Sequence, residues 1–136
     1  MKEKKYKITM NEKQMQLMSE ALEFHSRFCA GQLDHFPPAL QKYMWNSKEF
    51  QYRDSRYLDL LYELKRIIWD LEPNASHGIG WEEIPEMNLG YEMYKMIEYY
   101  KVNRRIKDGE NLDYNVHSSQ PIKYTHEPLI KIEEIK

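Results

Sequence analysis

The sequence has little of several features that mark well-known protein classes. It contains one cysteine and five glycines in 136 residues. One cysteine excludes a framework of internal disulfides and is typical of a reducing compartment. No apolar run approaches the roughly 18 residues of a membrane-spanning helix, and the N-terminal residues lack the apolar core of a secretory signal. The sequence therefore predicts a cytoplasmic protein with no membrane contact, and its length favours a single domain over residues 1–136.

An excess of charge of one sign is also missing. Twenty lysines and arginines stand against 22 aspartates and glutamates, which gives a formal net charge of −2. Proteins that coat DNA, and polybasic segments that bind membranes, need an excess of positive charge. The charge balance therefore predicts that neither DNA nor a membrane is a partner.

The residue patterns of common enzymes are absent from the sequence as well. It has no Gly-rich phosphate loop, no Gly-x-Ser-x-Gly elbow and no His-Glu-x-x-His motif. Its five histidines lack the three- or four-residue spacing that places two metal ligands on one helical face. Cys29 follows an apolar arc, where a structural thiol is the usual state. We therefore expect no catalytic residue, no metal site and no cofactor.

Aromatic residues are what the chain has in abundance. It carries 11 tyrosines, four phenylalanines and three tryptophans, together with eight methionines. Such residues either fill a helical core or line pockets and subunit interfaces, and composition leaves both explanations open. Together with an apolar arc that covers more than one side of the first expected helix, the tyrosine content predicts a homo-oligomer, a dimer or larger.

Capping residues and hydrophobic periodicity predict three to four helices. The first begins after Asn11, which has Gln14 three residues later in capping-box spacing, and Gly31 ends it. A short helix opens at the two prolines of 37–38. The last helix is capped by Asn88 and ends near residue 108. The helix before it carries the clearest amphipathic stripe, which consists of Leu58, Leu61, Leu64, Ile68 and Leu71.

Short alternating segments at both ends of the chain predict strands. Residues 5–10 place Tyr6, Ile8 and Met10 on one face, and the tail from residue 114 holds similar pieces. The expected fold class is therefore α+β. Three to four helices would pack on a small antiparallel sheet formed from the N-terminal strand and C-terminal strands.

One group of side chains has the composition of a site for a nucleotide-derived ligand. Such a ligand needs guanidinium groups for its phosphates and flat rings for its base. Tyr100 and Arg104 are four residues apart and share a helical face, and Arg105 follows. Arg27 and Phe28 stand near the end of the first helix. For Tyr100, Arg104 and Arg105 the alternative is a charged helix end that complements the helix dipole, and for Arg27 it is an ordinary ion pair.

Three stretches of the chain resemble a known family. They are residues 5–14 (KYKITMNEKQ), 21–32 (ALEFHSRFCAGQ) and 90–99 (GYEMYKMIEY). In this order they are similar to the phage-encoded Thoeris anti-defence family of the first described type, whose members are small-molecule sponges. The chain departs from the family pattern at Glu98, where arginine is expected, and at Gly90, where alanine is expected. Residues 33–56 match no part of the pattern.

The resemblance implies a protein that sequesters cyclic ADP-ribose isomers made by immune TIR enzymes and does not degrade them. Some relatives hold cyclic oligonucleotides as well. A protein–protein interaction module that inhibits a host enzyme is the main alternative, and a hydrolase acting on a nucleotide is a weaker third. On the first hypothesis we expect arginines to hold the phosphates and aromatic rings to border the base or ribose. The expected ligand-binding residues are Arg27, Phe28, Trp81, Tyr91, Tyr100, Arg104 and Arg105.

Overall fold

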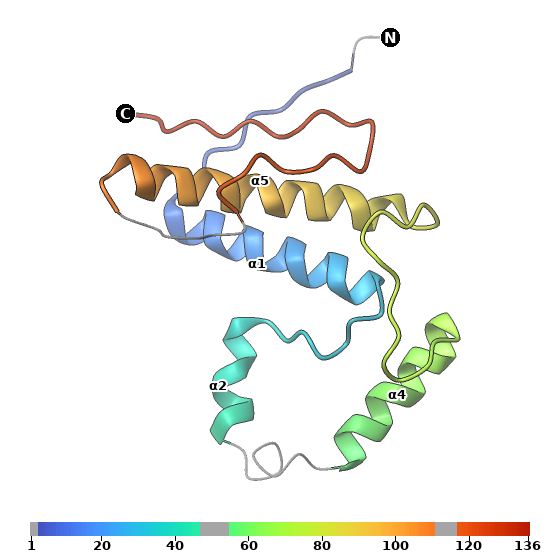
Figure 1. Ribbon diagram of the computed structural model, residues 1–136. Coiled ribbons are helices and arrows are strands. Elements are labelled where there is room, and N and C mark those ends of the chain that lie inside the picture. Colours follow the sequence, from blue (N-terminus) through green and yellow to red (C-terminus); the bar gives the residue numbers. More distant parts are fainter. Residues whose placement is uncertain (1–2, 47–54, 111–116) are drawn as a thin grey trace.

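The computed structural model of the chain describes residues 3–46, 55–110 and 117–136. Its helices are α1 (Glu12–Cys29), α2 (Pro38–Asn46), α4 (Ser55–Trp69) and α5 (Pro85–Lys107). The two longest, α1 and α5, pack against each other, and this pair is the centre of the molecule (Figure 1). Extended segments from both chain ends run across α5 on the side opposite α2 and α4.

The two ends of α1 follow the local signals of the sequence. Asn11 Oδ1 accepts from the Gln14 backbone N–H at 2.9 Å, and Gln14 Oε1 accepts from the Asn11 backbone N–H at 2.9 Å. This capping box satisfies two amides of the first turn. Gly31 has φ +86° directly after the C-cap residue Ala30. Both predicted boundaries are confirmed, because each depends on residues within a few positions of one another.

The helices α1 and α5 approach each other closely at two small residues. Ser26 is fully buried, and its hydroxyl donates to the carbonyl oxygen of Met87 at 2.9 Å. A Cβ on Gly90 would lie 2.9 Å from the Ser26 Oγ and 3.4 Å from the His25 Cδ2. A larger side chain at Gly90 would therefore push the two backbones apart.

The predicted start of α5 at Asn88 is wrong. The helix begins at Pro85, with Ile84 as the N-cap residue. Proline has no N–H and its φ is already helical, so it opens a helix without a side-chain cap. Asn88 is buried in the first turn, where it accepts from the Gly80 N–H at 2.6 Å and donates to the Trp81 carbonyl oxygen at 3.0 Å. The side chain expected to cap the helix instead holds the preceding loop.

The predicted antiparallel sheet is wrong, and with it the α+β fold class. The described residues form helices and contain no strand. In the tail, Pro121 and Pro128 each lack the backbone donor that a strand ladder needs. The tail is attached to α5 by a side chain instead. The carboxylate of Glu92, which is 1% exposed, accepts from the backbone N–H groups of Tyr124 and Thr125 and from the Thr125 hydroxyl.

The amphipathic stripe predicted in residues 58–71 faces inward only in part. Its members Leu64 and Ile68 are exposed. The reason is the attachment of α4 to α1 through Trp69, whose Nε1–H donates to the carbonyl oxygen of Cys29 at 3.0 Å. This contact fixes the rotation of α4 about its axis. The half-buried members of the stripe are Leu58, Leu61 and Leu71.

The tail contact yields a first testable prediction. Glu92→Ala leaves the Tyr124 and Thr125 amides without their acceptor, so we expect a loss of about 2–4 kcal/mol in the free energy of unfolding. The tail should also become accessible to protease. Limited proteolysis with mass spectrometry and urea unfolding measure the two effects. Glu127→Ala removes an exposed carboxylate from the same tail and serves as the control. Equal cleavage of both variants would contradict the attachment.

Candidate functional site

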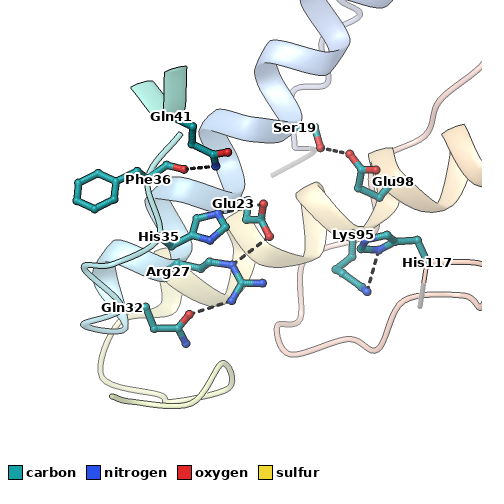
Figure 2. A network of polar contacts seen from close by, with 10 residues as sticks. All are labelled: Ser19, Glu23, Arg27, Gln32, His35, Phe36, Gln41, Lys95, Glu98 and His117. Carbon is teal, nitrogen blue, oxygen red and sulfur yellow. Dashed lines mark hydrogen bonds and ion pairs between the residues drawn. The ribbon is translucent and has the colours of Figure 1, made fainter. Parts of the chain in front are cut away.

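Polar side chains occupy the interface between α1 and α5 (Figure 2). The buried hydroxyl of Ser19 donates to Glu98 Oε1 at 2.6 Å. Lys101 Nζ lies 3.3 Å from the same oxygen and also donates to Gln16 Oε1. Glu98 stands where the family pattern has arginine, and in this chain its carboxylate joins the two helices. At this position the chain therefore has an acidic side chain that makes an interhelical contact.

Glu23 is the centre of the polar contacts near the end of α1. Its carboxylate lies 3.0 Å from Arg27 Nε and 3.3 Å from His35 Nε2, and it accepts a hydrogen bond from the Tyr94 hydroxyl. Burial alone would raise the pKa of Glu23. The hydrogen bonds from Tyr94 and Arg27, and the charges of Arg27 and His35, outweigh burial and lower that pKa below its ordinary value of 4.5. Glu23 is therefore a carboxylate at neutral pH.

Arg27 is held within its own chain. Besides Glu23, its guanidinium donates to Gln32 Oε1 at 2.8 Å through Nη1, and Figure 2 shows this amide beyond the end of α1. Tyr91 is close enough to Arg27 for the positive charge to oppose the rise in the Tyr91 pKa that burial causes. The Tyr91 ring also lies 6.2 Å from the Tyr124 ring of the tail. Two expected ligand-binding residues, Arg27 and Tyr91, are therefore near enough to interact electrostatically.

A second polar pair joins α5 to the tail, beside these contacts. Lys95 Nζ is 3.0 Å from His117 Nδ1, and the His117 ring packs edge-on against the Tyr94 ring at 5.7 Å. Burial lowers the pKa of His117, and the charge of Lys95 lowers it further. Burial also lowers the pKa of Lys95. A neutral imidazole can accept the lysine proton at Nδ1, so this pair connects the tail to α5 near its middle.

A groove of about 350 Å³ lies between the C-terminal half of α5 and the tail. Its volume is near the lower end of pockets that hold small molecules. One wall consists of aromatic rings and of polar and cationic side chains from successive turns of α5, and the other wall is the extended tail. The lining residues are Met96, Tyr99, Tyr100, Asn103, Arg104, Lys107 and 130–132.

The guanidinium of Arg104, which lines the groove, already pairs with two carboxylates. Its Nη1 lies 2.8 Å from Glu134 Oε2 of the tail, and its Nε lies 3.5 Å from Asp108 Oδ2. Arg104 and both carboxylates are partly exposed, so water and salt weaken these pairs. An incoming phosphate would compete with Glu134 for the same guanidinium.

The other expected residues lie outside the groove. Arg105 does not line it and pairs with Glu110 at 2.7 Å. Phe28 packs against the rings of Phe24 and Trp69 at 5.8 and 5.9 Å between centroids. The Trp81 ring stacks on His77 at 3.5 Å.

The structure thus divides the expected residues between places too far apart for one ligand. Tyr100 and Arg104 share the groove, whereas Arg27 and Tyr91 share the helix interface. Tyr91 and Arg104 are thirteen residues apart on α5, so the two places are separated by roughly 20 Å along the helix axis.

Sequence reasoning missed several groove residues. Tyr99, Asn103 and Lys107 follow at steps of four along the face beside Tyr100 and Arg104. Helical spacing was the signal that could have found them. No sequence pattern could have placed residues 130–132 in the groove, because the sequence of the tail does not show which helix the tail crosses.

Comparisons of the chain with protein-family models, with curated proteins and with solved structures find no match. No helix in the described part of the chain is long and apolar enough to cross a membrane. Within residues 3–46, 55–110 and 117–136, no three His, Cys, Asp or Glu side chains are grouped so as to hold a metal ion.

The lowered pKa of Glu23 yields a pH prediction. A carboxylate whose folded-state pKa is depressed stabilises the fold above its unfolded pKa and loses that effect as the pH falls through the folded pKa. Glu23→Gln should therefore lower the free energy of unfolding by about 1–3 kcal/mol at neutral pH. The difference in the free energy of unfolding between this variant and the wild type should become smaller as the pH falls below 4.5, the ordinary pKa of glutamate.

Urea unfolding across a pH series measures this gap. Glu20→Gln removes a charge from the same helix, where Gln16 donates to the carboxylate, and serves as the control. A gap between wild type and Glu23→Gln that stays constant into acid would contradict the assignment.

Proposed function

We propose that the protein is a phage anti-defence sponge, which binds a cyclic ADP-ribose isomer in the host-cell cytoplasm and holds it without degrading it. The observation that carries the proposal is the groove between α5 and the tail, where tyrosine rings adjoin an arginine and a lysine. The resemblance of residues 5–14, 21–32 and 90–99 to the sponge family supports the same ligand class.

The groove offers the two kinds of contact that such a ligand requires. Its pyrophosphate carries negative charge, for which Arg104 and Lys107 supply a planar fork and a point charge. Its adenine is flat, and the rings of Tyr99 and Tyr100 are available to pack on it. Asn103 follows these rings on the helix and lines the groove; its Nδ2 donates to the Tyr99 carbonyl oxygen at 2.8 Å, and its Oδ1 can accept from a ribose hydroxyl. Noncovalent sequestration needs no further chemistry than this.

The ion pair between Arg104 and Glu134 supports Arg104 as the phosphate contact. A carboxylate already occupies the guanidinium at 2.8 Å, so the fork points into a place that an anion can reach. Arg27 is less suited, because its side chain is less exposed than that of Arg104 (29% against 40%) and does not line the groove. We therefore assign the phosphates to the groove, and we assign Arg27 to the packing of α1 on α5.

The proposal is tested by recovering the ligand after binding. The protein is incubated with cyclic ADP-ribose and its glycosidic isomers, freed of unbound ligand by filtration, and then denatured by heat. Mass spectrometry identifies what is released. A sponge releases the ligand intact, an enzyme releases product, and a protein–protein interaction module retains nothing. Either of the last two results would contradict the proposal.

The contact between Arg104 and the ligand is tested by comparing an Arg104 variant with a variant of Arg105, the next residue on α5. A charge-assisted hydrogen bond contributes about 1.5–3 kcal/mol, so Arg104→Ala should weaken binding by roughly one to two decades. Arg105→Ala is the matched control, because Arg105 pairs with Glu110 outside the groove. Isothermal titration with the retained isomer measures both affinities. Equal affinities of the two variants would place the phosphates elsewhere.

Removing the competing carboxylate should have the opposite effect. An exposed ion pair is worth up to about 1 kcal/mol, so Glu134→Gln should tighten ligand binding by roughly two- to fivefold. Glu127→Gln makes the same charge change in the tail away from Arg104, and it should leave the affinity near that of wild type. The same calorimetric titration measures the ligand affinity of both variants. Weaker binding by Glu134→Gln would contradict the competition and show that the tail carboxylate contributes to ligand binding.

A further inference from the structure

A hollow of about 390 Å³ lies beside the buried side of α4. One wall consists of side chains of α4, and the others consist of residues 32–34, which follow α1, and residues 73–76, which follow α4. We call this space the α4 hollow. None of its lining residues belongs to the groove between α5 and the tail. Its volume is within the range of small-molecule sites, so it is a second place with room for a ligand.

Contacts within the chain hold the walls of the α4 hollow in place. Trp69 Nε1–H donates to the carbonyl oxygen of Cys29 at 3.0 Å, which attaches the end of α4 to the end of α1. The backbone N–H of His77 donates to the carbonyl oxygen of Ala30 at 2.8 Å, so the chain that follows residues 73–76 returns to the same place. The walls are therefore positioned by the fold itself, as is usual for ligand sites.

The α4 hollow contains a buried charge that the described residues leave without a counter-ion. Lys65 lines the hollow and is 8% exposed. Its Nζ donates to the carbonyl oxygen of Pro73 at 2.8 Å. Within residues 3–46, 55–110 and 117–136, no carboxylate forms an ion pair with it. A lysine ammonium has three donors, and buried lysines are rare unless an anionic group pairs with them.

We propose that the α4 hollow binds a small organic monocarboxylate with an apolar body, whose carboxylate accepts hydrogen bonds from Lys65 Nζ. The carboxylate supplies both the negative charge and the acceptors that the ammonium lacks within the described part of the chain. Charge-assisted hydrogen bonds of this kind are the strong ones. The inference does not depend on the ligand proposed for the groove.

Leucine side chains beside Lys65 indicate that the rest of the ligand is apolar. Leu33 is buried, and Leu58 and Leu61 are half-buried. Leu58, Leu61 and Lys65 follow at i, i+3 and i+7 and share one face of α4. Leu61 precedes Lys65 by about one helical turn, roughly 6 Å along the axis. A carbon chain of similar length therefore reaches from the ammonium to the leucines.

The remaining charged residue of the α4 hollow argues against a phosphate. Asp34 lines the hollow, and its carboxylate repels a dianion more strongly than a monoanion. Phosphate sites commonly use the planar fork of arginine, and no arginine is among the residues that line this hollow in the described part of the chain. A single negative charge therefore suits the one ammonium.

Isothermal titration of the full chain with 4-methylpentanoate tests the site. 4-Methylpentanamide has the same shape without the charge, and it should bind at least roughly tenfold more weakly. Inorganic phosphate should also bind more weakly than the carboxylate. This comparison uses the wild-type protein, so it holds even where a variant fails to fold.

Lys65→Gln removes the charge and keeps a donor for the Pro73 carbonyl oxygen. It should weaken binding of 4-methylpentanoate by roughly tenfold or more. Arg66→Gln is the matched control, because it removes the same charge from the next residue, which pairs with Glu72 outside the hollow. Arg104→Ala should also leave this affinity unchanged, since Arg104 lines the groove instead. Circular dichroism checks that each variant is folded.

Two kinds of molecule carry the proposed chemistry, a simple carboxylic acid and a free apolar amino acid. Leucine has the branched chain of 4-methylpentanoate and adds an ammonium group that Asp34 would attract. Tighter binding of leucine, reduced in Asp34→Asn, would identify the amino acid as the source. Tighter binding of 4-methylpentanoate, unchanged or improved in Asp34→Asn, would identify the simple acid.

Three results would overturn the proposal. The first is a wild-type chain that binds neither carboxylate, or that binds the amide as tightly as the acid. The second is inorganic phosphate that binds as tightly as 4-methylpentanoate, which would indicate a general anion site. The third is equal affinity of Lys65→Gln and Arg66→Gln for 4-methylpentanoate, which would place its carboxylate away from Lys65.

Discussion

The packing of α1 against α5 depends on a close approach that only small side chains permit. At this point Ser26 has no exposed surface, and a Cβ on Gly90 would lie 2.9 Å from its hydroxyl oxygen. Because the backbones are so close, neighbouring side chains meet across the interface, where Glu23 accepts from Tyr94. The interface is polar, yet each buried side-chain donor and acceptor in the described residues has a partner. Such a network stabilises one arrangement of the two helices, since sliding either one would leave several groups unpaired.

The sequence predicts those parts of the fold that are decided locally. Asn11 and Gly31 mark the ends of α1 because capping and positive φ involve only adjacent residues. The predicted sheet is wrong because alternation of polar and apolar residues indicates an extended segment but does not show which segment, if any, pairs with it. Glu92, from the middle of a helix, supplies the acceptors that a neighbouring strand would have supplied. The helix α5 is covered by α1 on one side and by the tail on another. It therefore lacks a single polar face, and the periodicity of its apolar residues does not reveal which sides are buried.

In the candidate site, too, only features that depend on nearby residues could be predicted from the sequence. Helical spacing brought Tyr100 and Arg104 together, and both line the groove. Spacing could not show that Arg27 is bound by Glu23 and Gln32, because its partners are decided by side-chain packing. The amphipathic pattern of α4 likewise identifies an apolar stripe without specifying what covers it. That depends on Trp69, whose single hydrogen bond to α1 sets which side of α4 faces the protein.

The tail connects the structural and the binding parts of the molecule. It is attached to α5 by Glu92, and farther along it supplies both a wall of the groove and the carboxylate of Glu134. A ligand phosphate that displaces Glu134 from Arg104 exchanges one anion for another, so the guanidinium stays paired throughout. On the proposed function, the attachment at Glu92 would keep the displaced segment close to the groove while the ligand is bound. Because Glu92 is not among the residues that line the groove, the exchange of anions at Arg104 would leave this attachment and the contact between α1 and α5 unchanged.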